Sequence, residues 1–122
     1  MPGWYSRTVV AVADFQRAIE FYLGAFGFRE DWRHEESDGA RIMQVSREGC
    51  ELILSNQWPE RAGTGRFFVS LDPPDFEALR IEAEAKGIAG EGYWGYRLLV
   101  VADPDGNEFW FPHPTDVGGA SA

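Results

Sequence analysis

The sequence predicts an α+β fold of two tandem βαβββ modules, residues 6–55 and 66–112, within one domain spanning residues 1–122. An internal repeat is the first reason, because each half reads as a strand, a helix and three strands. The helices repeat an Asp near the start and a Gly at the end, as in Asp14–Gly27 and Asp75–Gly87. The second reason is a tight hairpin turn near the end of the chain. The third is the length of 122 residues, which is enough for one core. Each module is expected to be a curved mixed sheet with a helix on one face and a concavity on the other.

The first module begins with a Val-rich strand over residues 6–12. Asp14 is a plausible helix N-cap, and Gly27 ends the helix. Apolar residues at helical spacing predict one buried helix face, made of Phe15, Ala18, Ile19, Tyr22 and Phe26. Turn signals then separate three strands, Phe28–His34, Arg41–Arg47 and Cys50–Ser55.

The loop Asn56–Gly65 leads to the second module, which begins with a strand over Arg66–Leu71. Pro73 and Pro74 end that strand, and the second helix starts near Asp75. Its buried face is predicted at Phe76, Leu79 and Ala83, and three strands follow near Glu91–Trp94, Tyr96–Ala102 and Asn107–Pro112. A frayed tail of small and polar residues is expected over Pro114–Ala122.

The stretch Val100–Phe111 holds the hairpin turn, at Asp103–Asn107 between two apolar runs. Pro104 presets φ for a tight turn, and the Asp and Gly residues beside it suit the other positions. A calcium loop is the alternative, because acidic side chains recur here. It fails because Glu108 stands where that loop needs Gly, and Pro114 where it needs a bidentate Glu.

The composition limits the class of ligand. A formal net charge of −9 argues against direct nucleic-acid binding and favours attraction of cationic ligands. Aromatic residues make up 15% of the chain, and five of them are Trp, which leaves room for a stacking site beyond the core.

The single cysteine, Cys50, excludes an internal disulfide and a Cys-based metal cluster. The start, Met1–Trp4, lacks a secretory signal pattern, and no apolar run approaches the roughly 20 residues of a membrane span. The expected location is therefore the cytoplasm, with no membrane partner.

Several of these motifs together resemble the vicinal-oxygen-chelate superfamily, which holds glyoxalases, extradiol dioxygenases, fosfomycin-resistance enzymes and bleomycin-resistance proteins. The resemblance rests on their order along the chain, which is Val12–Phe15, Phe21–Leu23, Gly27-Phe28, Trp94-Gly95 and Asp103–Asn107. It implies that the two modules pair in a homodimer.

Metal-using members of that family carry ligands at four concave positions, and the resemblance places these at Arg7, Glu51, Arg66 and Trp110. Only Glu51 offers a lone pair, because Arg has no acceptor and Trp is donor-only. One carboxylate does not make a zinc site. His34 and His113, at strand ends, are expected to be surface residues rather than ligands. The resemblance therefore implies neither a metal nor another cofactor.

Two arginines in one concavity need a compensating charge, and Glu51 would supply it. The expectation is an Arg7–Glu51–Arg66 cluster capped by the Trp110 ring, in one chain or across the dimer. The alternative is that these side chains reach solvent separately.

Loss of the metal points to the non-catalytic, bleomycin-resistance type of the family, whose members are dimers that sequester an antibiotic. The expected ligand is a planar aromatic antibiotic, cationic or DNA-intercalating, bound for drug self-resistance, and Asp31 and Glu51 would attract its cation. The predicted ligand-binding residues are Arg7, Trp32, Glu51, Trp58, Arg66, Phe68, Trp94, Tyr96 and Trp110. Two alternatives stay open: a glyoxalase-like or dioxygenase-like metalloenzyme with ligands one or two residues away, and an orphan small-molecule binder.

Overall fold

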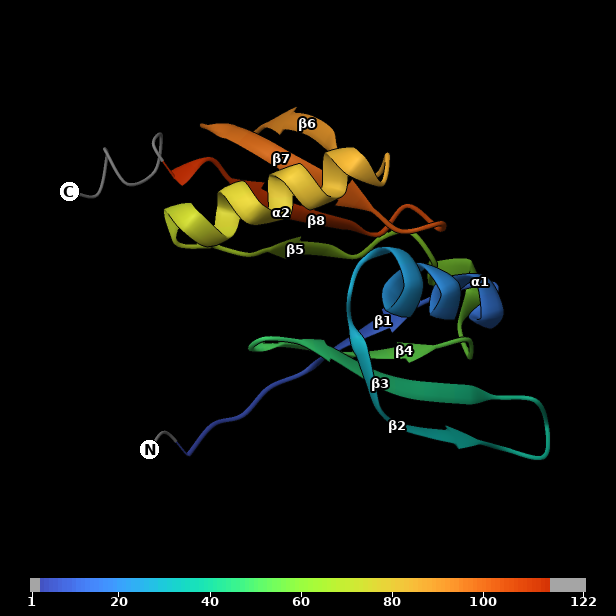
Figure 1. The fold of residues 1–122 in the computed structure, drawn as a ribbon. Coiled ribbons are helices and arrows are strands. Elements are labelled where there is room, and N and C mark those ends of the chain that lie inside the picture. The colour runs from blue at the N-terminus through green and yellow to red at the C-terminus, as the bar shows by residue number, and fades with distance from the viewer. Residues whose placement is uncertain (1–2, 115–122) are drawn as a thin grey trace. The chain divides into compact units, whose positions relative to one another are not determined.

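The computed structural model describes residues 3–114 of a chain that forms two compact units, Met1–Gly65 and Arg66–Ala122. Each unit holds a four-stranded mixed sheet and a helix (Figure 1). The strand order is β1-β4-β3-β2 in the first unit and β5-β8-β7-β6 in the second. In each unit the first strand runs parallel to the last, and the other neighbours are antiparallel. The predicted fold of two βαβββ modules is confirmed.

The first unit contains four strands and three helical segments. In chain order these are β1 Thr8–Ala11, α1 Phe15–Ile19, η1 Glu20–Ala25, β2 Arg29–Glu35, β3 Arg41–Arg47, β4 Cys50–Ser55 and η2 Pro59–Arg61. The boundaries of β3 and β4 coincide with those predicted from their alternating side chains. The strand β2 lies at the edge of the sheet, and each of its residues is exposed as a whole, although the Asp31 side chain is only 20% exposed.

The predicted single helix of the first unit changes its geometry halfway. Its start is as expected, since the Asp14 carboxylate accepts a hydrogen bond from the Arg17 backbone N–H at 3.1 Å. After α1 the chain widens into the π-helical segment η1, in which the Phe26 N–H donates to the Phe21 carbonyl at 2.8 Å. The wider turn lets Phe21 contact the rings of both Tyr22 and Phe26, with centroids 5.2 and 5.6 Å apart.

The core of the first unit lies between its helical segments and one face of its sheet. The buried side chains of this core include Val10, Met43, Val45, Leu52 and Leu54 from the sheet and Phe15, Ala18, Tyr22, Phe26 and Phe28 from the helical segments and the end of the turn after them. Since successive strand residues point to opposite faces, the same strands turn Gln44, Ser46, Glu51 and Ile53 to the other face. That second face carries the candidate site.

The second unit consists of β5 Arg66–Phe68, α2 Pro73–Ala85, β6 Gly90–Tyr93, β7 Arg97–Ala102 and β8 Glu108–Pro112. The strand β5 is shorter than predicted, and α2 starts two residues earlier than Asp75. Proline is tolerated in the first turn because the N–H it lacks has no helical partner there, so Pro73 and Pro74 open the helix instead of only ending a strand. The predicted helix face is buried, and it packs with Leu99, Val101, Phe109 and Phe111 in the core of this unit.

The predicted hairpin turn joins β7 to β8, which pair antiparallel. Asp103 is 5% exposed, and its carboxylate accepts three hydrogen bonds. They come from the backbone N–H groups of Asp105 and Asn107, both at 2.9 Å, and from the Asn107 side-chain amide at 2.8 Å. Gly106 has φ of 96°, the left-handed value that favours glycine. The turn is therefore organised by one buried carboxylate.

Within the described residues, no helix is long and apolar enough to cross a lipid bilayer. Of the predicted tail Pro114–Ala122, everything after Pro114 lies outside the described residues.

Replacing Asp103 with Ala should destabilise the protein by about 3 kcal/mol, because three donors in a buried turn lose a charged acceptor. The measurement is urea denaturation. The midpoint should fall, while the slope of the unfolding free energy against urea concentration should stay unchanged. Asp72→Ala is the matched control, because this exposed N-cap makes no side-chain capping bond. The control should cost less than about 1 kcal/mol. Equal losses in the two variants would contradict this role of Asp103.

Candidate functional site

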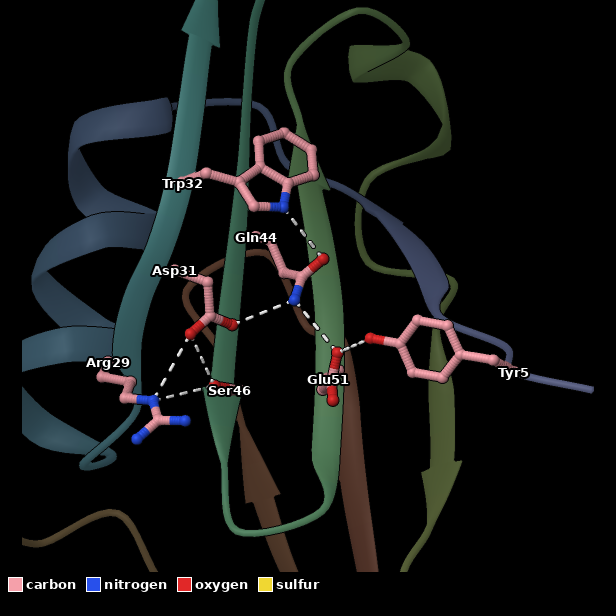
Figure 2. A network of polar contacts seen from close by, with 7 residues as sticks. All are labelled: Tyr5, Arg29, Asp31, Trp32, Gln44, Ser46 and Glu51. Carbon is pink, nitrogen blue, oxygen red and sulfur yellow. Dashed lines mark hydrogen bonds and ion pairs between the residues drawn. The ribbon is translucent and has the colours of Figure 1, made fainter. Parts of the chain in front are cut away.

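The candidate site of the first unit lies on the sheet face opposite its helical core. Gln44 in β3 stands opposite Ile53 of β4 and Trp32 of β2. In the next row, Ser46 stands opposite Glu51 of β4. Polar side chains from three neighbouring strands therefore meet at Gln44 (Figure 2).

The Gln44 side-chain amide makes all four hydrogen bonds that its chemistry allows. Its oxygen accepts from Arg7 Nη1 at 2.7 Å and from Trp32 Nε1 at 3.1 Å. Its nitrogen donates to Asp31 Oδ2 and Glu51 Oε1, each at 3.0 Å (Figure 2). Gln44 is only 6% exposed. The orientation of the amide is therefore determined, because a flipped amide would direct its N–H groups at two donors.

An irregularity in β2 brings both Asp31 and Trp32 to Gln44. The pairing of β2 with β3 shifts register between Glu30 and Trp32. The side chains of the consecutive residues Asp31 and Trp32 therefore both contact Gln44 on the same face of the sheet. Asp31 Oδ1 also accepts from the Ser46 hydroxyl at 3.0 Å. This bond, followed by the one from Gln44, holds the pKa of Asp31 below its usual value. Asp31 therefore stays ionised.

The N-terminal segment is tied to the same site through Tyr5 and Arg7. The Tyr5 hydroxyl donates a hydrogen bond to Glu51 Oε1 (Figure 2), which raises the pKa of Tyr5. The guanidinium of Arg7 lies 5.0 Å from the centroid of the Tyr5 ring, within cation–π range. Glu51 therefore accepts from two neutral donors, one on β3 and one in the segment before β1.

The second unit gathers aromatic rings where the first gathers polar groups. Phe68 of β5 lies 5.7 Å from Trp94 and 6.1 Å from Tyr96, centroid to centroid. Trp94 lies 5.5 Å from Trp110 of β8. Gly95, at φ of 79°, makes the turn between Trp94 and Tyr96. We call Phe68, Trp94, Tyr96 and Trp110 the aromatic cluster; Phe68 and Trp94 are 43% and 58% exposed.

A charged pair borders the aromatic cluster. Glu108 stands opposite Arg66 in the β5–β8 register, and Arg66 Nε lies 3.5 Å from Glu108 Oε1. The same oxygen accepts from Trp110 Nε1 at 2.8 Å. Arg66 also donates through Nη1 to the Gly106 carbonyl, at 3.2 Å. Arg66 and Trp110 thus share one carboxylate.

The predicted ligand-binding residues fall into two groups. Arg7, Trp32 and Glu51 meet at Gln44 in the first unit, while Phe68, Trp94, Tyr96 and Trp110 gather in the second beside Arg66. Trp58 precedes η2 and is exposed. The predicted Arg7–Glu51–Arg66 cluster stays a prediction.

Sequence reasoning missed Tyr5, Gln44, Ser46 and Glu108. A signal existed for three of them. Gln44 and Ser46 interrupt the apolar run of β3 at every second residue, as polar residues on a face opposite the core do. Glu108 shares the alternation of Trp110 in β8. Tyr5 had no such signal, because it precedes any regular element.

The donor set does not fit a divalent metal. Among the four positions that the resemblance assigned to metal ligands, Glu51 alone has a lone pair to offer, and its Oε1 already accepts two hydrogen bonds. In residues 3–114, no group of three His, Cys, Asp or Glu side chains comes together in a way that could hold a metal ion. Cys50 is part-buried, which raises the pKa of its thiol. His34 pairs with Glu36 at 3.0 Å, and the half-buried His113 lies 4.8 Å from the Phe76 ring.

Replacing Ser46 with Ala should raise the pKa of Asp31 toward its usual range, because the largest cause of its low value is removed. A carboxyl whose pKa is lower in the folded state stabilises the fold above its unfolded pKa of about 3.9. That stabilisation is lost as the pH falls through the folded pKa. The difference in unfolding free energy between wild type and Ser46→Ala should therefore be largest near neutral pH and should become smaller as the pH falls.

The measurement is an NMR titration of the Asp31 carboxyl, combined with urea denaturation across the same pH range. Ser70→Ala, an exposed serine of the second unit, is the control and should leave the Asp31 titration unchanged. An Asp31 pKa that is unaffected by Ser46→Ala would contradict the assignment.

Solved structures share this fold. The antibiotic-binding protein TnmS3 from Streptomyces sp. CB03234 is 24% identical, with a TM-score of 0.69 over 92% of this chain and 98% of that chain. A glyoxalase/bleomycin resistance protein from the same organism is 26% identical, with a TM-score of 0.66 over 88% and 99%. The fosfomycin resistance protein FosX from Mesorhizobium loti is 16% identical, with a TM-score of 0.66 over the whole of both chains.

No curated protein matches the chain in sequence. The family profile described as Glyoxalase/Bleomycin resistance protein/Dioxygenase superfamily matches residues 4–111, from the segment before β1 into β8. The chain therefore belongs to the glyoxalase/bleomycin resistance protein/dioxygenase superfamily.

Proposed function

We propose that this protein is a non-catalytic binding protein that sequesters a planar aromatic antibiotic, and so confers drug self-resistance. The observation that carries the proposal is the aromatic cluster of the second unit, in which Phe68 and Trp94 leave much of their surface exposed. Exposed apolar surface of this kind is a feature of ligand-binding sites. A flat ring that stacks on such side chains removes this surface from water.

The geometry of the cluster favours a planar ligand. Its rings are 5.5 to 6.1 Å apart between centroids and are tilted or edge-on to one another, not stacked face to face. Each ring can therefore offer a face or an edge to a further ring, which is the arrangement that aromatic pairs prefer. Several such contacts together select a flat polycyclic shape over a flexible aliphatic one.

Electrostatics favour a cationic ligand. The formal net charge of −9 attracts cations from a distance and raises their association rate. In the first unit, Asp31 remains ionised, and only one oxygen of Glu51 is used by Tyr5 and Gln44. Asp31 is already paired with Arg29, at 3.4 Å, so the second oxygen of Glu51 is the stronger candidate to attract a positively charged antibiotic.

The chemistry of the first unit supports binding over catalysis. An efficient general base has a pKa near the working pH, whereas the Asp31 hydrogen bonds lower its pKa. The side chains at the family's ligand positions do not suit a Lewis-acid metal, which weakens the metalloenzyme alternative. The similarity to an antibiotic-binding protein, at 24% identity, is in keeping with the proposal.

We further propose that the binding site is completed in a cytoplasmic homodimer. Each unit has a short strand, β1 or β5, at one edge of its sheet, and edge strands are positions where further pairing can occur. The single, part-buried Cys50 is in keeping with a reducing compartment.

Titration with a planar aromatic antibiotic should quench the intrinsic Trp fluorescence of the protein. The panel consists of a bleomycin-like, a mitomycin-like and a bisintercalating compound. Trp94→Ala should weaken binding about tenfold, because a stacked pair contributes on the order of 1 kcal/mol beyond its buried area. Since Trp94 is largely exposed, the variant should remain folded, which circular dichroism checks.

Trp4→Ala is the matched control, because Trp4 is 93% exposed and lies outside the aromatic cluster. It should leave the affinity unchanged, and so should added chelator. A loss of binding with chelator would favour the metalloenzyme alternative. If no compound quenches at micromolar concentration, the orphan-binder alternative becomes the better one.

Sedimentation at micromolar concentration should give a particle of twice the 13.7 kDa chain mass. The reason is that stable homodimers bury roughly 2,000 Å² or more and do not separate at such dilution. Raising the salt concentration tests whether surface charge alone holds the dimer together. A monomer under these conditions would contradict a site completed between two copies.

A further inference from the structure

Glu108 is not among the predicted ligand-binding residues, yet it controls the surroundings of one of them. It opens β8, and Trp110 follows two positions later on the same face of the strand. The Trp110 indole N–H donates to Glu108 Oε1 at 2.8 Å. A hydrogen bond to a carboxylate is stronger than one to a neutral acceptor, so it holds the indole plane in one orientation.

The Glu108 carboxylate is itself held in place from the other side. Arg66 Nε lies 3.5 Å from the same oxygen, and Arg66 Nη1 donates to the Gly106 carbonyl at 3.2 Å. A continuous set of contacts therefore runs from the β7–β8 turn through Arg66 and Glu108 to Trp110. Trp110 in turn lies 5.5 Å from Trp94 in the aromatic cluster.

This arrangement has two consequences for a ligand. The Trp110 N–H is already used, so Trp110 offers a ligand its ring and not a hydrogen bond. A carboxylate acceptor also polarises the donor that bonds to it, which makes the indole ring more electron-rich. An electron-rich face attracts cations more strongly, because cation–π attraction follows the negative charge on the ring face.

The first unit provides a contrast within the same chain. Trp32 also donates its indole N–H, but to the neutral amide oxygen of Gln44, at 3.1 Å. These two indole bonds therefore pair one Trp with a neutral acceptor and the other with an anion. The Trp with the anionic acceptor is Trp110, which belongs to the aromatic cluster.

We propose that Glu108 is a positioning residue that makes the aromatic cluster selective for electron-poor, cationic rings, and that it acts through the Trp110 indole. This inference rests on the proposed binding function and specifies the chemical class of the ligand. The ligand ring carries a delocalised positive charge, as a quinolinium or acridinium does, and stacks on the Trp110 side of the cluster.

The experiment compares two probes of nearly equal shape, N-methylquinolinium and quinoline, at a slightly alkaline pH where quinoline is neutral. Wild type should bind the cation about tenfold more tightly, a preference typical of a partly desolvated cation–π contact. Glu108→Gln keeps an oxygen acceptor for the Trp110 N–H and removes the charge. It should reduce the preference to about threefold or less and leave quinoline binding unchanged.

Glu91→Gln is the matched control, because it removes one carboxylate from an exposed position on β6 of the same unit. It should leave the preference intact. A double-mutant cycle with Trp110→Phe then asks whether Glu108 acts through the indole. The effect of Glu108→Gln on cation binding should largely vanish in the Trp110→Phe background. NMR should also show the Trp110 indole proton shifting upfield in Glu108→Gln.

Three outcomes would overturn the inference while the proposed binding function stands. In the first, wild type binds the two probes equally. In the second, the preference for the cation is the same in Glu108→Gln as in wild type. In the third, Glu108→Gln weakens cation binding equally with Trp110 and with Phe at that position. The last would mean that the carboxylate attracts the cation directly. Failure of every planar compound to bind would instead overturn the proposed function, and the inference with it.

Discussion

The candidate site of the first unit depends on one buried amide. Burying an amide without hydrogen bonds is costly, and Gln44 avoids this cost only by bonding to four side chains at once. These partners come from β2, from β4 and from the segment before β1. None of them can move far without leaving a polar atom of Gln44 unsatisfied. These bonds therefore fix how the side chains of the polar face lie relative to one another.

The two units use the same strand topology to present different chemistry. In the first unit, the face opposite the helical core carries carboxylates, an amide and a guanidinium, which recognise charge and hydrogen-bond donors. In the second, the aromatic cluster presents ring faces and edges, and the carboxylate of Glu108 accepts a hydrogen bond from the indole N–H of Trp110 beside it. Charge and planarity are therefore the two properties that the proposed function assigns to its ligand.

Much of the fold could be predicted because its signals are local. Alternation located β3 and β4 to the residue, and the Asp103–Asn107 turn was recognised from residue types alone. The helix after Asp14 was predicted as one regular element, whereas the structure widens it into η1. Helical periodicity does not distinguish an α-helix from a π-helical turn over so few residues. The structure shows that the rings of Phe21, Tyr22 and Phe26 pack together at this wider turn.

The sequence by itself determined the repeat and the faces of most strands, because these depend on residue type and spacing. Only the tertiary structure decided which side chains meet. The register shift that turns Asp31 and Trp32 to the same face depends on how β2 pairs with β3. The bonds of Gln44 to Asp31 and Glu51 likewise join different strands, and so does the contact between Arg66 on β5 and Glu108 on β8. Such contacts are set by strand pairing and packing, which no local pattern encodes.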